Sequence, residues 1–337
     1  MKREHCHLLL CGPFPEPVGG VSIHLRRLLA ALAAQPRYTV RCVDEAGRRK
    51  PGLFNLRSLN AWAYLRLLWW ADLVHVHSSV TLFRLLHVLC ARLLGKPVIV
   101  TLHSHRPRHR LEHGLTRLCC ALAQAVVAVN GVIRDAVCPA ALVIPAYIAP
   151  GADEEWVPAA LQDWIDRQRG QGRLLLVSNA YKLARFDGAD LYGLDTLLEV
   201  FERAPVRRRY ALLFVVASVD GCEAAYAGYQ RRIVERGLQE QVLLVHQPMP
   251  FAGLLKRCDV SVRATNTDGD ALSVRESLSY GKRTLASDCV ARPAGAELFA
   301  TRDADALAAL LQAPARHGAA DVDSFDLSLV NLYGTLS

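Results

Sequence analysis

The sequence predicts an α/β protein with two doubly wound parallel-sheet domains. Over residues 1–145, short apolar runs alternate with longer amphipathic segments, a pattern typical of a parallel sheet with helices on both faces. The alternation stops over residues 146–172, where prolines, glycines and acidic residues gather, and it then restarts. A chain of 337 residues is also long enough for two domains. We therefore expect domains over 1–150 and 173–337, joined by a linker over 151–172.

The first half contains six apolar runs that read as strands and four segments that read as helices. The strands are expected at His7–Gly12, Tyr38–Val43, Leu73–His77, Val98–Leu102, Ala125–Asn130 and Leu142–Pro145. The helices are expected at Val21–Ala34, Leu56–Trp70, Leu82–Leu94 and Leu111–Ala123. The first of these helices has leucines at 25, 28, 29 and 32, which places them on one face. Gly95 and Pro97 end the third helix.

The second half repeats the same alternation. Its strands are expected at Arg173–Ser178, Ala211–Ala217, Val242–His246, Val260–Arg263 and Thr284–Ser287. Its helices are expected at Leu194–Arg203, Glu223–Arg236, Phe251–Arg257 and Ser273–Tyr280. Gly281 follows the last helix in the position of a C-terminal cap. Both halves therefore have the succession of elements that builds a parallel sheet.

Positive charge is concentrated in the first half. Residues 1–150 carry 19 Lys and Arg against 7 Asp and Glu, whereas residues 151–337 carry 21 against 25, which gives formal net charges of +12 and −4. A basic domain favours an anionic partner, such as an acidic membrane, a phosphorylated substrate or nucleic acid. The sequence contains no zinc-finger or RRM signature, so we expect no nucleic-acid partner.

The ten cysteines indicate a reducing compartment. None belongs to a Cys-x-x-Cys pair, and most lie in apolar runs, where free cysteine behaves as a small core residue. The N-terminal stretch MKREHCHLLLCG is unlike a signal peptide, and no uncharged apolar run reaches the ~18 residues of a membrane span. We therefore expect a cytoplasmic protein, with at most peripheral contact with the inner face of the cytoplasmic membrane.

Polar residues gather where expected strands end, which is where parallel α/β sheets bind ligands. Gly19 and Gly20 stand between the first strand and the first helix, where backbone N–H groups could cradle an anion. An ordinary Pro/Gly turn is the alternative, since the loop matches neither the dinucleotide nor the Walker pattern. At the end of the third strand, His77 is expected to face the ligand, whereas His75 reads as a satisfied histidine of the core or surface.

A basic, histidine-rich segment, TLHSHRPRHRLEH, follows the fourth strand. His103 comes directly after the strand, and Arg106 and Arg108 follow. Arginine forks match phosphate oxygens, so the segment predicts phosphate or acceptor binding, with a solvated basic loop as the alternative. The spacing of the histidines at 103 and 105, and at 109 and 113, would also suit a metal, but only Glu112 accompanies them. We therefore expect no metal.

The segment TDGDALSVRESLSYG places Asp268 and Glu276 eight residues apart, across a loop and the start of a helix. One interpretation is structural: Ser273 and Glu276 have the spacing of a capping box. The other is that both carboxylates face a bound ligand. Near the first strand of the same half, Asn179, Lys182 and Arg185 could hold a diphosphate.

Taken together, these segments resemble the retaining glycosyltransferases of family 4, which have the GT-B fold of two Rossmann-like domains facing a cleft. The resemblance covers nearly the whole chain. It is carried by the Gly19-Gly20 loop, DLVHVHSS, KPVIVTLHSH, VVAVNGVI, VIPAYIAP, the Lys182 segment and TDGDALSVRESLSYGKRTLASD. The family usually has Glu-x7-Glu over a strand, loop and helix, and here Asp268 and Glu276 fill the two positions.

The resemblance implies a role for each matching residue. Glu276 would bind the ribose of a nucleotide-sugar, and Asp268 would sit beside the transferred sugar as a catalytic residue together with His103. The remaining implied contacts are Ala271, Leu272, Ser273, Asn179, Lys182, Arg185, Gly19 and Gly20 for the donor, and His77, Arg106 and Arg108 for the acceptor. No metal or other cofactor is implied.

The chain departs from the family pattern at three places. The usual Phe-Gly of the motif is Asp270-Ala271, the phosphate-clamping pattern is met only loosely by Asn179-Ala180 and Tyr192-Gly193, and little chain follows residue 325 for the family's C-terminal crossover helix. Two other functions therefore stay open. One is a GT-B epimerase or hydrolase of nucleotide-sugars, and the other is a non-catalytic nucleotide-sugar-binding partner protein.

The expected acceptor is a glycan, most simply one linked to a lipid diphosphate in lipopolysaccharide, capsule or exopolysaccharide assembly. The helix expected at Leu56–Trp70 is basic and aromatic, with Trp62, Trp69 and Trp70 among its residues. It could rest on an acidic bilayer with its rings at the interface. The alternative is that Trp62, Leu65 and Trp69 pack on the sheet.

Overall fold

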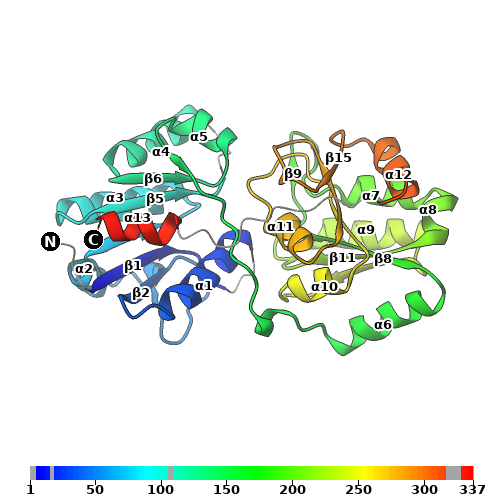
Figure 1. Cartoon of the computed structure of the whole chain (residues 1–337), viewed down its shortest axis with the longest axis horizontal. Coiled ribbons are helices and arrows are strands. Elements are labelled where there is room, and N and C mark those ends of the chain that lie inside the picture. Colours follow the sequence, from blue (N-terminus) through cyan, green and yellow to red (C-terminus); the bar gives the residue numbers. More distant parts are fainter. Residues whose placement is uncertain (1–4, 16–18, 105–108, 316–327, 337) are drawn as a thin grey trace. The chain divides into compact units, whose positions relative to one another are not determined.

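The computed structural model describes residues 5–15, 19–104, 109–315 and 328–336, and these form two parallel α/β units (Figure 1). The first unit comprises the chain up to Ala149 together with the C-terminal helix α13 (Ser328–Leu336). The second unit runs from Pro150 through the described chain to Ala315. The predicted fold class, two domains each with a parallel sheet, is confirmed.

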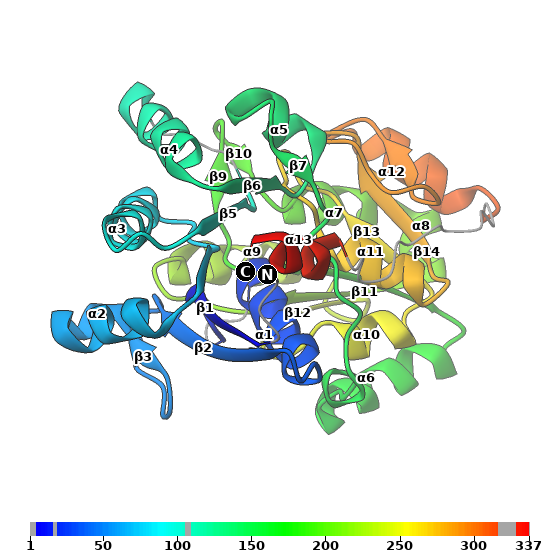
Figure 2. The same cartoon turned by 60° about the vertical axis from the view of Figure 1, so that its left-hand side comes forward.

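The first unit has a sheet of seven strands in the order β3-β2-β1-β4-β5-β6-β7, with all neighbours parallel. The strands are β1 (Cys6–Gly12), β2 (Tyr38–Asp44), β3 (Phe54–Asn55), β4 (Leu73–Val76), β5 (Val98–Leu102), β6 (Ala125–Ala128) and β7 (Leu142–Val143). The helices before α13 are α1 (Gly20–Ala33), η1 (Leu56–Ser58), α2 (Ala61–Trp70), α3 (Thr81–Leu93), α4 (Arg110–Leu122) and α5 (Gly131–Val137). Apolar side chains of α1 and α13 pack on one face of this sheet, and Figure 2 shows α2 and α3 on the other.

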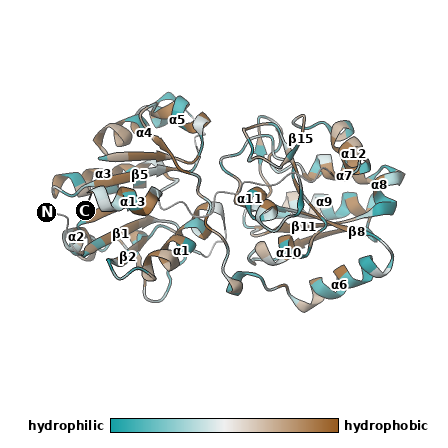
Figure 3. Ribbon diagram, in the orientation of Figure 1, coloured by the Kyte–Doolittle hydropathy of each residue, from teal (hydrophilic) through white to brown (hydrophobic). Residues whose placement is uncertain are grey.

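The second unit has a sheet of six parallel strands in the order β12-β11-β8-β13-β14-β15. The strands are β8 (Leu174–Ala180), β11 (Tyr210–Val216), β12 (Val242–His246), β13 (Val260–Arg263), β14 (Arg283–Ser287) and β15 (Glu297–Phe299), with an antiparallel hairpin of β9 (Arg185–Phe186) and β10 (Ala189–Asp190). The helices and the one 3₁₀ turn are η2 (Ala152–Glu154), α6 (Ala159–Gly170), α7 (Leu194–Phe201), α8 (Ala204–Arg209), α9 (Glu223–Glu235), α10 (Ala252–Arg257), α11 (Leu272–Ser279) and α12 (Ala304–Gln312). Figure 3 shows the strands largely hydrophobic, as expected for a sheet covered on both faces.

Two expectations about the organisation of the chain are wrong. The segment expected to be a linker, 151–172, contains α6, and Leu161, Trp164 and Ile165 of that helix pack in the core of the second unit. The C-terminal helix α13 belongs to the first unit rather than the second, since Leu329 and Tyr333 are buried in the core of the first unit. The chain therefore does have a C-terminal helix that returns to the first unit.

The helix expected at Leu56–Trp70 is interrupted. A 3₁₀ turn, η1, ends at Leu59, whose φ of 56° is left-handed, and Asn60 then caps α2 by accepting the N–H of Ala63 at 3.0 Å. Among the described helices, none is long and apolar enough to cross a bilayer.

Candidate functional site

The first unit gathers three histidines at the carboxyl edge of its sheet. His77 follows β4, His103 follows β5, and α1 contributes His24. Because β4 and β5 are parallel neighbours, their carboxyl ends meet at the same edge, which brings His77 and His103 together. Their rings are bonded through Nδ1 of His77 and Nε2 of His103 at 3.0 Å. We call these three residues the histidine triad.

The third member of the triad is oriented by the backbone. His24 bonds the carbonyl oxygen of Ala146 through Nδ1 at 2.8 Å, and since a carbonyl only accepts, Nδ1 must carry the proton. Nε2 of His24 and Nε2 of His77 are both buried and have no hydrogen-bond partner among the described residues. Buried polar atoms normally have partners, so two such nitrogens in one cluster are unusual.

The triad is neutral at neutral pH. Burial lowers the pKa of His24 to about 4, and the nearby Arg27 lowers it further, against the opposing effect of the Ala146 hydrogen bond. Burial, together with neighbouring histidines, also lowers the pKa of His77 and of His103 well below the ordinary value. These side chains therefore offer uncharged nitrogens, as hydrogen-bond donors or as lone pairs, rather than positive charge.

His75 lies beside the triad and is fully satisfied. Its Nδ1 pairs with the hydroxyl of Tyr333 at 2.6 Å, and its Nε2 pairs with the hydroxyl of Thr101 at 2.7 Å. The prediction that His75 is a satisfied histidine is confirmed, and its place is in the core. It also ties α13 to the sheet strand that carries His77.

The glycine pair begins the first helix as expected. Gly19 is the N-cap of α1, and its N–H donates to the hydroxyl oxygen of Ser22 at 2.9 Å. Gly20 is exposed, and a Cβ placed on it would meet no atom within 4 Å among the described residues. Packing within the unit therefore does not require a glycine at position 20. Arg106 and Arg108, predicted to contact the acceptor, lie outside the described residues.

In the second unit, Asp268 is held by two arginines. Arg263, the last residue of β13, reaches it with Nε to Oδ2 at 2.9 Å and Nη2 to Oδ1 at 3.2 Å, and Nη1 of Arg292 reaches Oδ2 at 3.1 Å. Thr265 donates its hydroxyl to the same carboxylate at 3.1 Å. Burial opposes the charged form, but the charges and hydrogen bonds of the two arginines outweigh it and hold the pKa of Asp268 well below its ordinary value.

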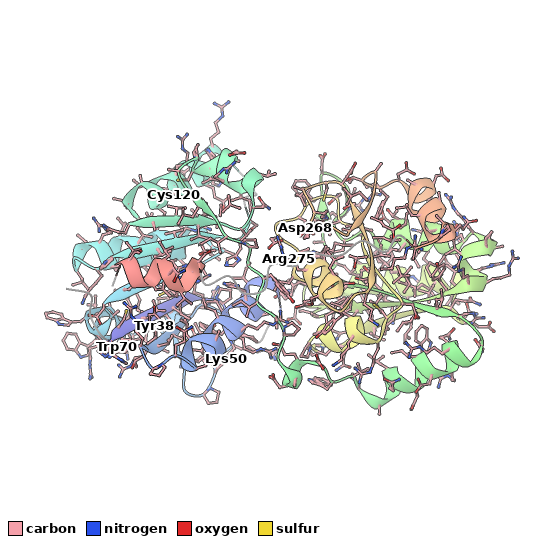
Figure 4. The ribbon with its side chains drawn as sticks, in the orientation of Figure 1. Tyr38, Lys50, Trp70, Cys120, Asp268 and Arg275 are labelled. Carbon is pink, nitrogen blue, oxygen red and sulfur yellow. The ribbon has the colours of Figure 1, made fainter. Side chains whose placement is uncertain are left out.

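These contacts change the interpretation of Asp268. The sequence suggested a carboxylate that touches the sugar, yet both carboxylate oxygens already accept bonds from protein donors. Only 8% of the side chain is exposed. Figure 4 shows Asp268 in the loop that leads into α11, with Arg275 on that helix. The observed contacts fix this loop, and the catalytic role that the family resemblance implies for Asp268 stays a prediction.

Glu276 lies on α11 and is buried, 4% exposed. The capping-box alternative is wrong, because the helix starts at Leu272 with Ala271 as its N-cap, so Ser273 is already inside the first turn. Alanine has no polar side chain, and the N-cap makes no side-chain hydrogen bond. The predicted C-terminal cap is confirmed, since Gly281 has a φ of 66° and its N–H donates to the carbonyl of Leu278.

The expected diphosphate clamp is not assembled by the second unit in this structure. Lys182 donates to the carbonyl of Asp220, while Arg185 donates to the carbonyl of Gly188 within the β9–β10 hairpin. Asn179 does lie in the Asp268 cluster, since Nη1 of Arg263 is 3.4 Å from its carbonyl oxygen. Within the described ranges, Asn179 is therefore the one of the three predicted residues that shares a contact with the Asp268 cluster.

Sequence reasoning missed three residues of these clusters. Arg263 was detectable, because it ends a strand, which is the criterion that selected His77. His24 lies one turn beyond the glycine pair, on a helix face otherwise assigned to the core. Arg292 stands 24 positions beyond Asp268, and no local pattern connects the two.

Residues 18–156 match the sequence profile of Glycosyltransferase Family 4. No curated protein matches the chain. The match covers the glycine pair, the three triad histidines and the strands that carry His77 and His103.

Solved structures with the same fold extend over nearly the whole chain. HepE of Anabaena in complex with UDP and glucose is 14% identical, with a TM-score of 0.67 over 91% of this chain and 89% of that one. Sucrose-phosphate synthase of Thermosynechococcus elongatus is 17% identical, with a TM-score of 0.64 over 91% and 89%. The lipopolysaccharide outer core galactosyltransferase WaaB is 13% identical, with a TM-score of 0.59 over 90% and 88%. These likenesses confirm the predicted GT-B fold.

Proposed function

Because the chain has the GT-B fold and belongs through residues 18–156 to glycosyltransferase family 4, we propose that it transfers a sugar from a nucleotide-sugar to a hydroxyl of a glycan with retention of anomeric configuration. Either a UDP- or a GDP-linked donor suits the site, and a UDP-sugar is favoured because HepE was solved with UDP-glucose. The acceptor we favour is a lipid-diphosphate-linked glycan of a cell-surface polysaccharide such as lipopolysaccharide, capsule or exopolysaccharide. The galactosyltransferase WaaB, which has the same fold, supports this choice.

The observation that carries the proposal is Glu276 on α11. Glu276 is a buried carboxylate in α11, and carboxylate oxygens accept hydrogen bonds from hydroxyl groups such as those of a ribose. The N-terminus of α11 lies just before Glu276 in the chain and has no side-chain cap. The backbone N–H groups of Leu272 and Ser273 can therefore donate hydrogen bonds to sugar or phosphate oxygens. Carboxylate and helix terminus together suit the two ends of a nucleotide-sugar.

The Asp268 cluster supports this donor site indirectly. Arg263 and Arg292 hold the loop before α11 through Asp268, so the helix terminus is fixed before the donor arrives. Positioning of this kind favours catalysis, because hydrogen-bond donors that already point at the developing charge need not move when the reaction occurs. Lys182 and Arg185 each bond a backbone carbonyl and have further N–H donors that could contribute to the diphosphate.

We propose a front-face substitution at the anomeric carbon. The bond to the diphosphate oxygen breaks, the acceptor oxygen bonds from the same side, and the departing phosphate oxygen takes the acceptor proton. A double displacement would need a carboxylate nucleophile. We do not assign this role to Asp268, because its carboxylate is bonded to two arginines. His103, the residue assigned by the family resemblance to the reacting carbon, would contribute a neutral hydrogen bond. We propose that the reaction needs no metal.

The donor assignment can be tested by saturation-transfer NMR with a panel of UDP- and GDP-sugars. Glu276→Gln keeps the shape of the side chain but removes the carboxylate, and we expect the donor signal to fall at least about tenfold, as for a lost charge-assisted hydrogen bond. The matched control is Glu199→Gln, an exposed glutamate of α7, which should bind normally. Binding by no donor, or unchanged binding by Glu276→Gln, would contradict the proposal.

The reaction itself is tested with the donor so identified. Product anomeric configuration, read by proton NMR, should match that of the donor, and added chelator should leave the rate unchanged. Release of free sugar or a new epimer without any acceptor would instead favour the hydrolase or epimerase alternative. Donor binding without turnover on any acceptor would favour a binding protein.

We also propose peripheral contact with an acidic membrane through the outer faces of α2 and α3. The alternative in which Trp62, Leu65 and Trp69 pack on the sheet is wrong, because Trp62 is 72% and Trp69 76% exposed. On α3 the exposed residues Leu82, Leu86, Leu89 and Leu93 follow helical spacing along one face. Lys96 donates to the carbonyl of Trp69 at 2.8 Å, so the segment after α3 lies against the C-terminal end of α2. Exposed apolar side chains with basic neighbours fit a bilayer carrying anionic lipid.

Vesicle co-sedimentation tests this contact. The double variant Trp62→Ser, Trp69→Ser should bind vesicles containing phosphatidylglycerol about tenfold more weakly or worse, since burying one such side chain contributes about 1.5–3 kcal/mol. Trp156→Ser, at a half-exposed tryptophan of the second unit, is the control. Equal vesicle binding by the double variant and the wild type would show that this surface does not contact the membrane.

A further inference from the structure

The histidine triad has the arrangement of a metal-binding site. One ring nitrogen from each of His24, His77 and His103 lies within 4.8 Å of the others. The three ring centres form a nearly equilateral triangle with sides of 5.2, 5.1 and 5.3 Å. We propose that the triad binds a divalent transition-metal ion, with Zn²⁺ as the expected occupant.

The triangle has the size that a shared ion requires. An imidazole bound to zinc through a nitrogen at about 2.1 Å has its centre about 3.2 Å from the ion, so three rings at tetrahedral angles lie about 5.2 Å apart. The observed centres already match this separation. The nitrogens would have to come within about 3.4 Å of one another, which requires the rings to turn in place while their centres stay where they are.

The hydrogen bonds around the triad suit coordination. His24 donates Nδ1–H to the carbonyl of Ala146, which fixes the tautomer and leaves a lone pair on Nε2. A backbone carbonyl in this position is a usual outer partner of a metal-bound histidine. Nε2 of His24 and Nε2 of His77 are buried and have no hydrogen-bond partner in the part of the chain that the structure describes, and a metal ion would satisfy such a nitrogen. These two nitrogens are therefore available to bind an ion.

The chemistry of the triad selects the kind of ion. It contains imidazole nitrogen but no carboxylate or thiolate, which disfavours Mg²⁺ and Ca²⁺ and favours zinc or its neighbours in the first transition row. Three protein ligands leave a fourth position open, and His103, the partly exposed member, gives access to it.

Metal binding would inhibit the proposed reaction. This consequence, unlike the site itself, rests on the proposed function, in which His103 contributes a hydrogen bond at the reacting carbon. An ion on His103 would engage the ring nitrogen and break its bond to His77. Transfer would then need no metal and would be lost when zinc is present.

The site can be tested without any sugar donor. Tag-free wild-type protein is titrated with Co²⁺, and visible absorption reports a tetrahedral, nitrogen-ligated ion; zinc competition gives the affinity. We expect one such ion per chain, and we expect His77→Gln and the less buried His103→Gln each to weaken it at least about tenfold. His87→Gln is the matched control, a buried histidine of the same unit whose nitrogens already bond Tyr64 and Glu45.

The outcomes separate the two proposals. Cobalt absorption that is lost in both triad variants but kept in His87→Gln supports the site, whether or not the protein proves to be a transferase. Absorption that persists in both triad variants places the ion on other histidines or cysteines and overturns the proposal, as does the absence of any tetrahedral signal in a folded wild type. The two triad variants are checked by circular dichroism, so that a misfolded one is replaced by the other.

Discussion

The two candidate clusters have opposite electrostatic characters. In the first unit, the triad consists of neutral rings joined to one another and to a backbone carbonyl. In the second, Asp268, Arg263 and Arg292 form a charged network in which every contact is a charge-assisted bond. The first offers uncharged donors and lone pairs, and the second holds the loop before α11 in place. Four experiments test this contrast.

The largest effect is expected when the charged network is broken. Asp268→Ala leaves two arginines, 14% and 2% exposed, without their carboxylate, and we expect a loss of about 3–5 kcal/mol in the free energy of unfolding. Asp135→Ala is the control, since its pair with Arg134 is exposed, and it should change stability by less than about 1 kcal/mol. Denaturant unfolding measures both. Similar small losses in the two variants would show that Asp268 is not held as the structure describes.

Mild acid should weaken the first unit before the second. His24 has a folded pKa of about 4 against about 6.5 unfolded, so the unfolded chain binds the proton more readily and stability falls as pH drops through this window. The shift is worth about 3 kcal/mol for His24 alone. The titratable groups that interact with His24 are His75, His77 and His103, and the charged group beside it is Arg27.

The second unit provides the comparison in the same experiment. The pKa of Asp268 is lowered, so its stabilising contribution is present above the ordinary aspartate pKa of about 4 and is lost only below it. Hydrogen exchange at pH 7.5 and 5, with chelator present and corrected for intrinsic rates, should show lost protection in β4 and β5 but not in β13. If β13 lost protection before β4 and β5, the second unit would be the more acid-sensitive one and the prediction would be wrong.

The link between α13 and the triad can be weakened in a graded way. Tyr333→Phe leaves Nδ1 of His75 buried without its partner at 2.6 Å, and we expect a loss of about 1–3 kcal/mol. Tyr38→Phe removes a longer bond of 3.3 Å to the carbonyl of Val330 on the same helix and should cost less. Thermal unfolding of the two variants gives the order. An equal loss in both variants would show that the bond from Tyr333 to His75 contributes no more to stability than the bond from Tyr38 to Val330.

Sequence patterns predicted the parts of the fold that depend on local burial. The strands β5, β12 and β13 have the predicted bounds, and β5, all of whose residues are buried, shows how a strand covered on both faces is read from its apolar run. Helix α6 was missed although Leu161, Trp164 and Ile165 have helical spacing, because the surrounding prolines and acidic residues indicated a linker. Its apolar face was the stronger signal.

The candidate sites were predicted only where a residue stands at the end of a strand. His77 and His103 were found in this way, because strand order follows from the α/β pattern and places them at one edge. His24 could not be joined to them, since the helix register that brings its ring within 5.2 Å of His77 is set by packing. The same holds for Arg292, which reaches Asp268 across a loop.

The smallest effect on stability, and the clearest separation of stability from function, is expected at Gly20, with Gly193 as its opposite. Gly193 has a φ of 70°, and a Cβ there would lie 2.1 Å from the carbonyl oxygen of Ala264, so Gly193→Ala should destabilise the second unit by several kcal/mol through strain and overlap. Gly20 has open space around it and begins a helix, so Gly20→Ala should change unfolding by less than about 1 kcal/mol. If its backbone N–H approaches a donor phosphate, as proposed, the same methyl group should still lower kcat/KM at least about tenfold. A Gly20→Ala variant with wild-type stability and wild-type turnover would remove the glycine loop from the site and leave the helix terminus of α11 as the phosphate-binding element.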